Sequence, residues 1–307
     1  MKAVILDGHT INPGDLSWKP IEDLCDELTD YDKTEPDDII DRATDCEILM
    51  TSKCQITEDI LDALPDLKYI GETATGYNNI DVAAAARRGV AVTNVPAYST
   101  EAVCQHTIAL LLELTNSVGI HDRDVHDGGW TGSEFFCYWL KPASLLSGKS
   151  LGIIGYGTIG KRVAEVVRAL GMTINIYSRD PGSVMGSDFI SLHCPLTEDN
   201  AGMINEEFLS RMKEGSCLIN TARGGLIDEQ ALAEALNSVH LAGAAVDVLS
   251  SEPPGKDNPL LSARNCIITP HIAWVPRETR QKVIDILAEN LKTWLEGGTM
   301  NRIDIRS

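Results

Sequence analysis

Short apolar runs alternate with segments of helical pattern in the first third of the chain. Four of these runs are rich in valine and isoleucine and predict strands at residues 2–7, 47–51, 68–73 and 90–94. Residues 56–64 and 81–88 lie between them and have the spacing of helices. Asn78 and Asn79 are candidate caps of the second helix, and Gly89 is its candidate terminator. This alternation predicts a small doubly wound domain with a parallel sheet.

The middle of the chain begins with an apolar segment and continues with a polar one. Residues 100–119 (TEAVCQHTIALLLELTNSVG) are apolar on most sides, which predicts a buried helix between two layers. Residues 121–141 are polar and contain several glycines and tryptophans. A second domain is therefore expected to begin just before residue 100.

Six further apolar runs predict a second parallel sheet, with strands at residues 151–154, 173–177, 189–193, 217–220, 241–246 and 266–269. Residues 161–170 predict a helix. Residues 277–298 predict a long amphipathic helix that ends in two glycines. We expect interleaved domains, the first formed by residues 1–98 and 278–307 and the second by residues 99–277.

Composition and charge narrow the classes of function. The chain has 307 residues, 43% of them hydrophobic, which suits two domains with cores of their own. Its 45 acidic and 26 basic residues give a formal net charge of -19, so the surface should repel nucleic acid and anionic lipid. No apolar run approaches the roughly 18 residues of a membrane span. Asp7 interrupts the apolar start where a signal peptide would stay apolar, which predicts a cytoplasmic protein without nucleic-acid or membrane partners.

The eight cysteines form no C-x-x-C pair and lie mostly in apolar runs, as free thiols do in reducing compartments. We therefore expect neither a disulfide framework nor a zinc site. His121 and His126 stand near several aspartates, but a solvated polar face explains them better than a metal site.

Residues 151–160 (LGIIGYGTIG) have the spacing of a dinucleotide-binding turn. Gly155, Gly157 and Gly160 follow a predicted strand and open a predicted helix. In such a turn the glycines provide the tight bend, the approach of backbone to pyrophosphate, and the close contact of helix with strand. The helix N-terminus offers free N–H groups to the phosphates. The sequence therefore predicts a Rossmann domain that binds NAD(P)H.

The choice between NADH and NADPH stays open at the sequence level. Ser178 and Arg179 stand where an acidic residue usually accepts from the adenosine ribose, and Asp180 comes one position later. A hydroxyl and a guanidinium can accommodate a 2′-phosphate, which permits NADPH. Alternatively, Arg179 stacks on adenine and NADH is the usual partner.

Three motifs at predicted strand ends supply candidates for catalysis: INTARGG (219–225), VDVLSSEPP (246–254) and TPHIAW (269–274). Reduction of a 2-keto acid needs a cation that holds carboxylate and carbonyl oxygens, and Arg223 offers a planar donor fork. It also needs a proton donor near neutrality, which His271 can supply. Glu252 is the candidate carboxylate that favours the protonated imidazole and fixes its tautomer.

With these motifs and ATGYNNID (74–81), the whole sequence resembles the D-isomer-specific 2-hydroxyacid dehydrogenase family, and the segment WTGSEFFCYW (130–139) resembles its glycerate dehydrogenase, or hydroxypyruvate reductase, branch. The resemblance implies a Rossmann domain inserted into a flavodoxin-like substrate domain. It gives Arg223, Glu252 and His271 the roles described above. It places substrate carboxylate at Thr75 and Gly76, and cofactor at Thr158, Ile159, Pro195, Thr221, Ala222 and Asp247.

The expected reaction is hydride transfer from NAD(P)H to hydroxypyruvate, giving D-glycerate, or to glyoxylate, giving glycolate. A phosphoglycerate dehydrogenase-like enzyme and a nucleotide-sensing corepressor-like protein of the same fold are the alternatives. The resemblance also implies a homodimer in which residues 100–139 contact the partner and Trp139 reaches the partner's cleft.

One connection departs from the doubly wound pattern. Only residues 178–188 separate two predicted strands where a helix, a further strand and another helix are usual. Either the chain lacks that unit, which would expose a sheet edge and loosen the adenosine pocket, or about 20 residues are missing from the sequence. The resemblance favours missing residues.

Overall fold

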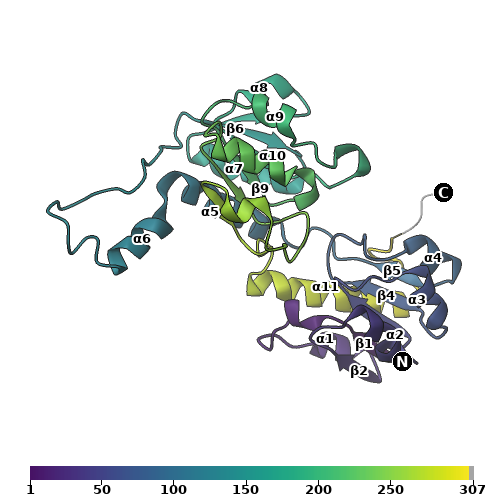
Figure 1. Ribbon diagram of the computed structural model, residues 1–307. Helices are drawn as coiled ribbons and strands as arrows, with labels where there is room; N and C mark the ends of the chain where they lie inside the picture. The colour runs from purple at the N-terminus through teal and green to yellow at the C-terminus, as the bar shows by residue number, and fades with distance from the viewer. Residues whose placement is uncertain (304–307) are drawn as a thin grey trace. The chain divides into compact units, whose positions relative to one another are not determined.

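The computed structural model describes residues 1–303, and Figure 1 labels its helices and strands. The chain divides into two compact units. The first unit holds Met1–Tyr98 and the chain from Val275 onward, and the second holds Ser99–Trp274. No helix in the described part is both long and apolar enough to cross a membrane.

The first unit contains a five-stranded parallel sheet in the order β2-β1-β3-β4-β5. Its strands are β1 (Lys2–Ile5), β2 (Glu27–Asp30), β3 (Ile48–Thr51), β4 (Tyr69–Glu72) and β5 (Ala91–Thr93). Four of them lie within predicted ranges, which confirms those predictions. The sequence analysis missed β2, because this edge strand reads ELTD and is mostly exposed.

Helices cover both faces of this sheet: α1 (Lys19–Glu22), α2 (Ile39–Ala43), α3 (Glu58–Ala63), α4 (Val82–Arg87) and α11 (Arg277–Leu295). The core on one face joins Ile39 of α2, Leu61 of α3 and Ala85 of α4 to the buried side chain of Ile70. On the other face, α11 lies against β4, where the rings of Tyr69 and Trp294 have centroids 5.0 Å apart. The C-terminal helix therefore belongs to the first unit.

The N-terminus of α4 corrects one detail of the sequence analysis. Asp81 caps the helix, and its carboxylate accepts a hydrogen bond from Ala84 N at 2.8 Å. Asn78 and Asn79 stand too early in the chain for that role, since a cap is the residue that directly precedes the first turn. Gly89 follows the helix with φ +73°, as expected of a terminator.

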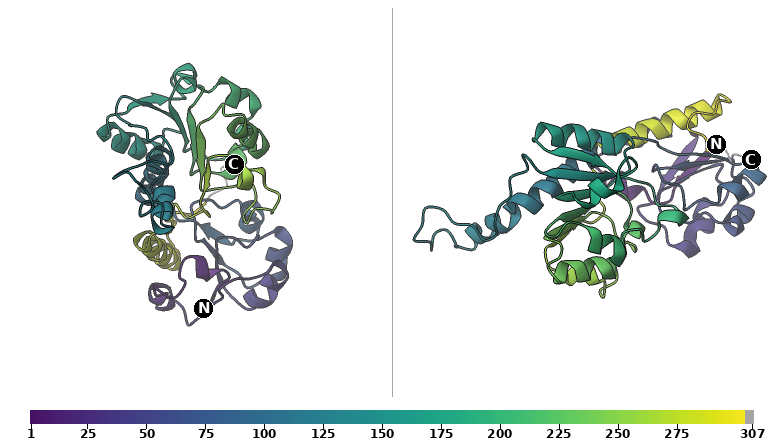
Figure 2. Two further views of the ribbon diagram at one scale, coloured as in Figure 1. Left: turned by 60° about the vertical axis from the view of Figure 1, so that its left-hand side comes forward. Right: turned by 90° about the horizontal axis from the view of Figure 1, so that it is seen from above.

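Two consecutive helices, α5 (Thr100–Asn116) and α6 (Val118–His126), open the second unit. α5 is the predicted buried helix and packs against α7, β9 and β10. Ser117 breaks the run with φ +49°, and α6 then continues into the polar stretch, for which no helix was predicted. α6 and the loop behind it project from the rest of the unit, and we call residues 117–145 the arm (Figures 1 and 2).

The second unit contains a six-stranded parallel sheet in the order β11-β10-β9-β8-β6-β7. Its strands are β6 (Ser150–Ile154), β7 (Thr173–Ile176), β8 (Phe189–Leu192), β9 (Cys217–Asn220), β10 (Gly243–Val246) and β11 (Cys266–Ile268). The helices after α6 are α7 (Thr158–Ala169), α8 (Pro181–Met185), α9 (Glu206–Arg211) and α10 (Glu229–Asn237). The six predicted strands and the helix after the glycine-rich turn are confirmed.

The connection from β7 to β8 is short because it contains a single short helix, α8. β7 is an edge strand, and β8 lies on the far side of β6, so the chain crosses over β6 through α8 alone. A Cβ at Gly152 of β6 would lie 2.7 Å from Val184 Cγ1, so α8 rests closely on β6 because Gly152 has no side chain. A continuous crossover through α8 joins the two strands of this sequence, and β7 is left as the sheet edge. The expectation of about 20 missing residues stays a prediction.

Candidate active site

Three candidate catalytic residues follow three neighbouring strands of the second sheet. Arg223 comes after β9, Glu252 after β10 and His271 after β11. Because the strands are parallel, their carboxyl ends meet at one edge of the sheet, where ligands of such folds bind. The three residues therefore lie at the carboxyl edge of the second sheet.

His271 and Glu252 are in direct contact. The imidazole Nδ1 lies 2.6 Å from Glu252 Oε2, and about a third of each side chain is exposed. Leu249 N donates to the other oxygen, Oε1, at 3.1 Å, which fixes the orientation of the carboxylate. Because the carboxylate engages Nδ1, the second ring nitrogen, Nε2, is the one that can serve a substrate oxygen.

The backbone at His271 has a left-handed conformation, with φ +55°. Asp247, directly after β10, stabilises this turn: its carboxylate accepts hydrogen bonds from Ile272 N at 2.9 Å and Ala273 N at 2.8 Å. The backbone oxygen of Asp247 accepts a third bond, from His271 N at 2.8 Å. Since Asp247 is 1% exposed and its oxygens serve this turn, the structure gives it a positioning role. Its expected proximity to the nicotinamide stays a prediction.

Two further residues support Asp247, and the sequence analysis assigned neither. The hydroxyl of Thr269 donates to Asp247 Oδ1 at 2.6 Å. His106, on α5, places Nε2 3.0 Å from the same hydroxyl and 3.4 Å from Oδ1. The signal that could have found His106 is a polar residue inside a predicted buried helix, since such a residue needs a partner in the core.

Arg223 is exposed and directed by a fixed loop. Asn220 holds this loop at both ends, since its amide donates to Arg223 O at 2.8 Å and its Oδ1 accepts from Ala222 N at 3.0 Å. One nitrogen of the guanidinium donates to Ala222 O at 2.7 Å. Among the described residues no carboxylate pairs with Arg223, so its charge is available to an anionic ligand.

The glycine-rich turn between β6 and α7 has the shape that a dinucleotide requires. A Cβ at Gly155, where φ is +96°, would lie 2.4 Å from Cys194 N, and one at Gly160 would lie 2.2 Å from Gly155 O. A Cβ at Gly157 would meet nothing within 4 Å, so the turn is open on that side. No side chain caps α7, which leaves its first N–H groups free for phosphate oxygens.

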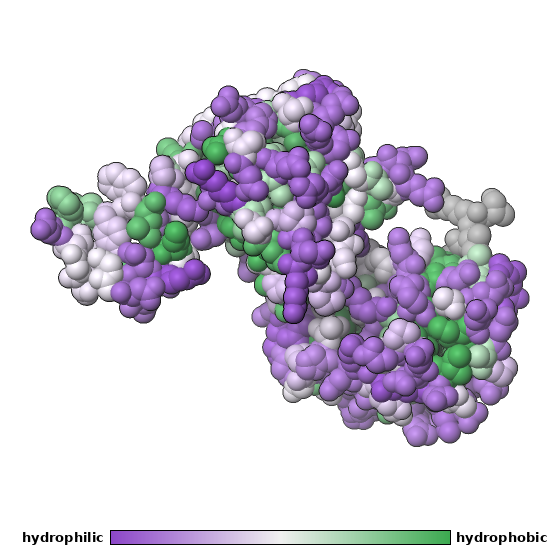
Figure 3. All heavy atoms as spheres, viewed as in Figure 1, coloured by the Kyte–Doolittle hydropathy of each residue, from purple (hydrophilic) through white to green (hydrophobic). Residues whose placement is uncertain are grey.

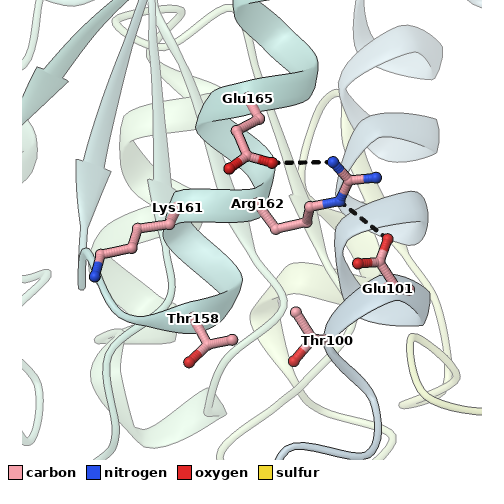
Figure 4. A pocket seen from close by; sticks show the side chains of 6 residues that line it. All are labelled: Thr100, Glu101, Thr158, Lys161, Arg162 and Glu165. Atoms are coloured by element: carbon pink, nitrogen blue, oxygen red, sulfur yellow. Dashed lines mark hydrogen bonds and ion pairs between the residues drawn. The ribbon is translucent and has the colours of Figure 1, made fainter.

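A cavity of about 400 Å³ lies beside this turn, between the first turns of α5 and α7 (Figure 4). Thr158 and Thr100 line its lower side, and Arg162 is held at 3.0 Å by both Glu101 and Glu165. Lys161 points away from this ion-pair cluster (Figure 4). Arg162 is therefore a structural cation, whereas Lys161 is not engaged by the cluster.

The other expected cofactor residues lie at the same strand ends, with partners of their own. The guanidinium of Arg179 lies 5.7 Å from the centre of the Tyr156 ring, and Asp180 caps α8 by accepting from Ser183 N at 3.2 Å. Thr221 is buried and exchanges a hydrogen bond of 2.9 Å with Thr107. Ser178 follows β7, Ile159 lies in the first turn of α7, Pro195 follows β8, and Ala222 precedes Arg223.

Thr75 and Gly76 belong to the first unit, on the loop that follows β4. The Thr75 hydroxyl donates to Val95 O at 2.8 Å, and Asn94 donates to Thr75 O at 2.7 Å. Gly76 is half-buried beside it. The loop is thus fastened to the segment that follows β5.

Comparisons with known proteins agree with this geometry. The family model of the D-isomer specific 2-hydroxyacid dehydrogenase, NAD binding domain, matches residues 108–273. The chain is 42% identical to the hydroxypyruvate reductase of Blautia hydrogenotrophica, covering 99% of this chain and 100% of that protein. The chain belongs to the D-isomer specific 2-hydroxyacid dehydrogenase family.

Two other proteins are also similar to this chain. The glycerate dehydrogenase of Methylorubrum extorquens is 38% identical, covering 91% of this chain and 92% of that protein. The solved glyoxylate/hydroxypyruvate reductase from Sinorhizobium meliloti, in complex with NADP and malonate, has a TM-score of 0.83 at 26% identity, covering 98% of this chain and 96% of that one. The expected family and fold class are confirmed.

The cofactor of this dehydrogenase is NAD(P)H, and the turn after β6 fits it. The close approaches at Gly155 and Gly160 and the open side at Gly157 form a cradle that a side chain would fill. The uncapped start of α7 provides N–H donors for a pyrophosphate. These observations are independent of the family match.

Among the described residues, no group of three or more His, Cys, Asp or Glu side chains could hold a metal ion. All eight cysteines are free thiols. His121 instead bonds to Ser117 O and Leu140 N within the arm.

Proposed function

We propose that the chain is an NAD(P)H-dependent reductase of small 2-keto acids, converting hydroxypyruvate to D-glycerate or glyoxylate to glycolate. The observation that carries the proposal is the His271 Nδ1 contact with Glu252 Oε2 at 2.6 Å, at the strand edge that also carries the exposed Arg223. The names of the similar proteins support these substrates.

Each residue has a chemical task in this reaction. The bound cofactor supplies a hydride to C2 of the keto acid. Arg223 binds the carboxylate and the carbonyl oxygen, and its charge stabilises the negative charge that develops on that oxygen. His271 donates the proton on Nε2 to the same oxygen and ends as a neutral imidazole. Glu252 accepts a hydrogen bond from Nδ1, which fixes the orientation of the ring and the tautomer that remains once Nε2 has given up its proton.

The two units divide the work in this proposal. We infer that the first unit, with expected bounds 1–98 and 278–307, binds the substrate carboxylate through backbone N–H groups at Thr75 and Gly76. The second, with expected bounds 99–277, binds the cofactor. The cradle of the glycine-rich turn supports the second assignment.

The test is oxidation of NAD(P)H in the presence of hydroxypyruvate, glyoxylate and 3-phosphohydroxypyruvate. We expect turnover with the first two and a fall of about 10³-fold in kcat for His271→Ala. The matched control His240→Ala removes an imidazole that precedes β10, at the opposite edge of the sheet from His271, and should leave kcat unchanged. Preference for the phosphorylated substrate would favour the phosphoglycerate dehydrogenase alternative. The absence of turnover with any 2-keto acid would favour a nucleotide-sensing protein.

We further propose that Ser178 and Arg179 bind the 2′-phosphate of NADPH. The exposed guanidinium beside Tyr156 supports a site for an anion or for an adenine ring. Replacing Arg179 with Ala distinguishes the two. Loss of a phosphate contact raises the KM for NADPH far more than that for NADH, whereas loss of stacking raises both alike.

We also propose a homodimer formed through the arm, in a cytoplasmic protein; the free thiols support that location. Apolar side chains are exposed along the arm, as Figure 3 shows. Phe136 is 89% exposed and Trp139 72%, which is costly for a surface without a partner. Light scattering should give the mass of two chains for the wild type and of one for Phe136→Ser with Trp139→Ser. The control Val239→Ser changes an exposed apolar residue elsewhere and should stay dimeric.

A further inference from the structure

The last residue of β4 is a carboxylic acid in the core of the first unit. Glu72 is 0% exposed. Its Oε2 accepts one hydrogen bond, from the side-chain amide of Asn79 at 3.0 Å. Its Oε1 has no hydrogen-bond partner among the described residues. An ionised carboxylate buried in this way would lack the donors and the cation that such a charge requires.

The charges around Glu72 are mixed. Asp7, at the end of β1, accepts from Thr51 Oγ1 at 2.8 Å and Lys53 N at 2.7 Å, so its negative charge is well satisfied. The charge of Asp7 raises the pKa of the Glu72 carboxyl, whereas the hydrogen bond from Asn79 and the Lys53 ammonium lower it. Burial, the largest cause, raises the pKa of the Glu72 carboxyl to about 9.

Asn79 joins Glu72 to the loop after β4. Its amide donates to Glu72 Oε2 and also to Cys54 O at 3.2 Å, and Asn79 O accepts from Ile56 N at 2.7 Å. The side-chain hydrogen bond between Glu72 and Asn79 therefore joins the two ends of the loop of residues 73–78. Thr75 and Gly76, the expected site of the substrate carboxylate, lie inside this closed segment.

We propose that Glu72 acts as a neutral carboxylic acid that fastens the loop of residues 73–78 through Asn79, and so sets the affinity of this loop for the substrate carboxylate. An ionised Glu72 at the base of the loop would repel an anionic substrate, and the site would lose its electrostatic complementarity to that substrate. The link to substrate rests on the proposed function; the neutral acid and the closed loop do not. Glu72 is a positioning residue in this scheme.

The charge of Glu72 is tested by unfolding the wild type and Glu72→Gln between pH 5 and pH 9.5. A buried acid that stays neutral in the folded protein ionises more readily when the protein unfolds. The unfolding temperature of the wild type should therefore fall relative to that of Glu72→Gln as the pH rises through this range. The control Glu22→Gln removes an exposed carboxylate and should follow the wild type. Parallel curves for wild type and Glu72→Gln would overturn the neutral acid.

The fastening is tested by hydrogen exchange of residues 73–79 at neutral pH. Glu72→Leu removes the acceptor for Asn79 and should raise exchange in this segment at least severalfold, whereas Glu72→Gln keeps an acceptor oxygen and should match the wild type. Equal exchange in all three proteins would contradict the fastening role. Because Glu72→Gln is nearly isosteric, it remains informative even if Glu72→Leu folds poorly.

The substrate link is tested by KM for glyoxylate and for NAD(P)H across the same pH range. We expect the wild-type KM for glyoxylate to rise severalfold above about pH 9 relative to that of Glu72→Gln, with the KM for NAD(P)H unchanged. Equal pH profiles would refute the link. If the wild type reduces no 2-keto acid, the proposed function and the substrate link fail together. The unfolding and exchange results then still decide the charge and the fastening.

Discussion

In each unit of this dehydrogenase a fully buried carboxyl group lies at the end of a parallel strand, and these two groups behave in opposite ways. Glu72 ends β4 of the first unit, and Asp247 follows β10 of the second. Their exposed fractions are nearly equal, 0% and 1%. Exposure therefore cannot explain why they differ.

The number of donors explains the difference. Burial alone would raise the pKa of Asp247, but hydrogen bonds from His106, Thr269 and two peptide N–H groups hold it below its usual value. Glu72 receives one hydrogen bond, and its pKa is raised. Asp247 is therefore an ionised carboxylate that accepts hydrogen bonds from a turn, whereas Glu72 is a neutral carboxylic acid at the base of a loop.

The largest effect should come from Asp247→Ala. This change leaves the N–H groups of Ile272 and Ala273 and the hydroxyl of Thr269 without their acceptor. We expect a loss of about 3 kcal/mol in the free energy of unfolding. Because the turn that carries His271 loosens, we expect kcat to fall by about 10²-fold. Denaturant unfolding and steady-state kinetics measure both. A variant with wild-type stability would show that the donors do not depend on this carboxylate.

The pH dependence of stability should have opposite signs at the two groups. The folded-state pKa of Glu72 is raised, so the stability that it contributes is complete below about pH 4.5 and is lost as the pH rises through about 9. The pKa of Asp247 is lowered, so its contribution is present above about pH 4 and is lost as the pH falls further. Each slope is at most about 1.4 kcal/mol per pH unit. Unfolding of Glu72→Gln and Asp247→Asn, each against wild type, isolates the two slopes; slopes of equal sign would contradict the comparison.

Thr269→Val removes one donor to Asp247 and keeps the shape of the side chain. We expect about 1 kcal/mol less unfolding free energy, since the remaining N–H donors still satisfy the carboxylate. The stability loss in acid should begin at a higher pH than in wild type, because fewer donors favour the ionised form. Thr299→Val, at an exposed residue beyond α11, is the matched control. If the loss of stability in acid begins at the same pH as in wild type, the Thr269 hydroxyl does not influence the ionisation of Asp247.

The smallest effect is expected for His106→Gln. His106 lies 3.4 Å from Asp247 Oδ1 and 3.0 Å from Thr269 Oγ1, and glutamine can still donate toward either group. We expect a loss of about 0.5 kcal/mol. His106→Leu, which cannot donate, should cost more. If the two variants are equally stable, the imidazole contributes packing rather than a hydrogen bond.

The fold was largely predictable because most strands are buried. β9 and the other strands of the second sheet follow apolar runs, whereas β2 is an exposed edge strand with no such signal. The break at Ser117 was also invisible, since a single residue with positive φ ends α5 without a glycine. Patterns of hydrophobicity report burial, so elements that are exposed or redirected by one residue escape them.

The candidate catalytic residues were found because their chemistry is local in sequence. Arg223, Glu252 and His271 each lie in a distinctive motif after a strand, and the structure brings Glu252 and His271 into contact. His106 was missed because its partners, Asp247 and Thr269, are distant in the chain. Glu72 was missed for a different reason: its partner Asn79 is close in sequence, but nothing in the sequence around Glu72 shows that this buried strand end lacks a cation.

The crossover from β7 to β8 also bears on protein engineering. Because α8 packs closely on Gly152, this short crossover requires a glycine at that position. Transplanted alone into a domain with any larger residue at the corresponding position, the short segment would lift from the sheet by the width of a methyl group. A chimaera that exchanges these crossovers must therefore carry residue 152 along with residues 178–188.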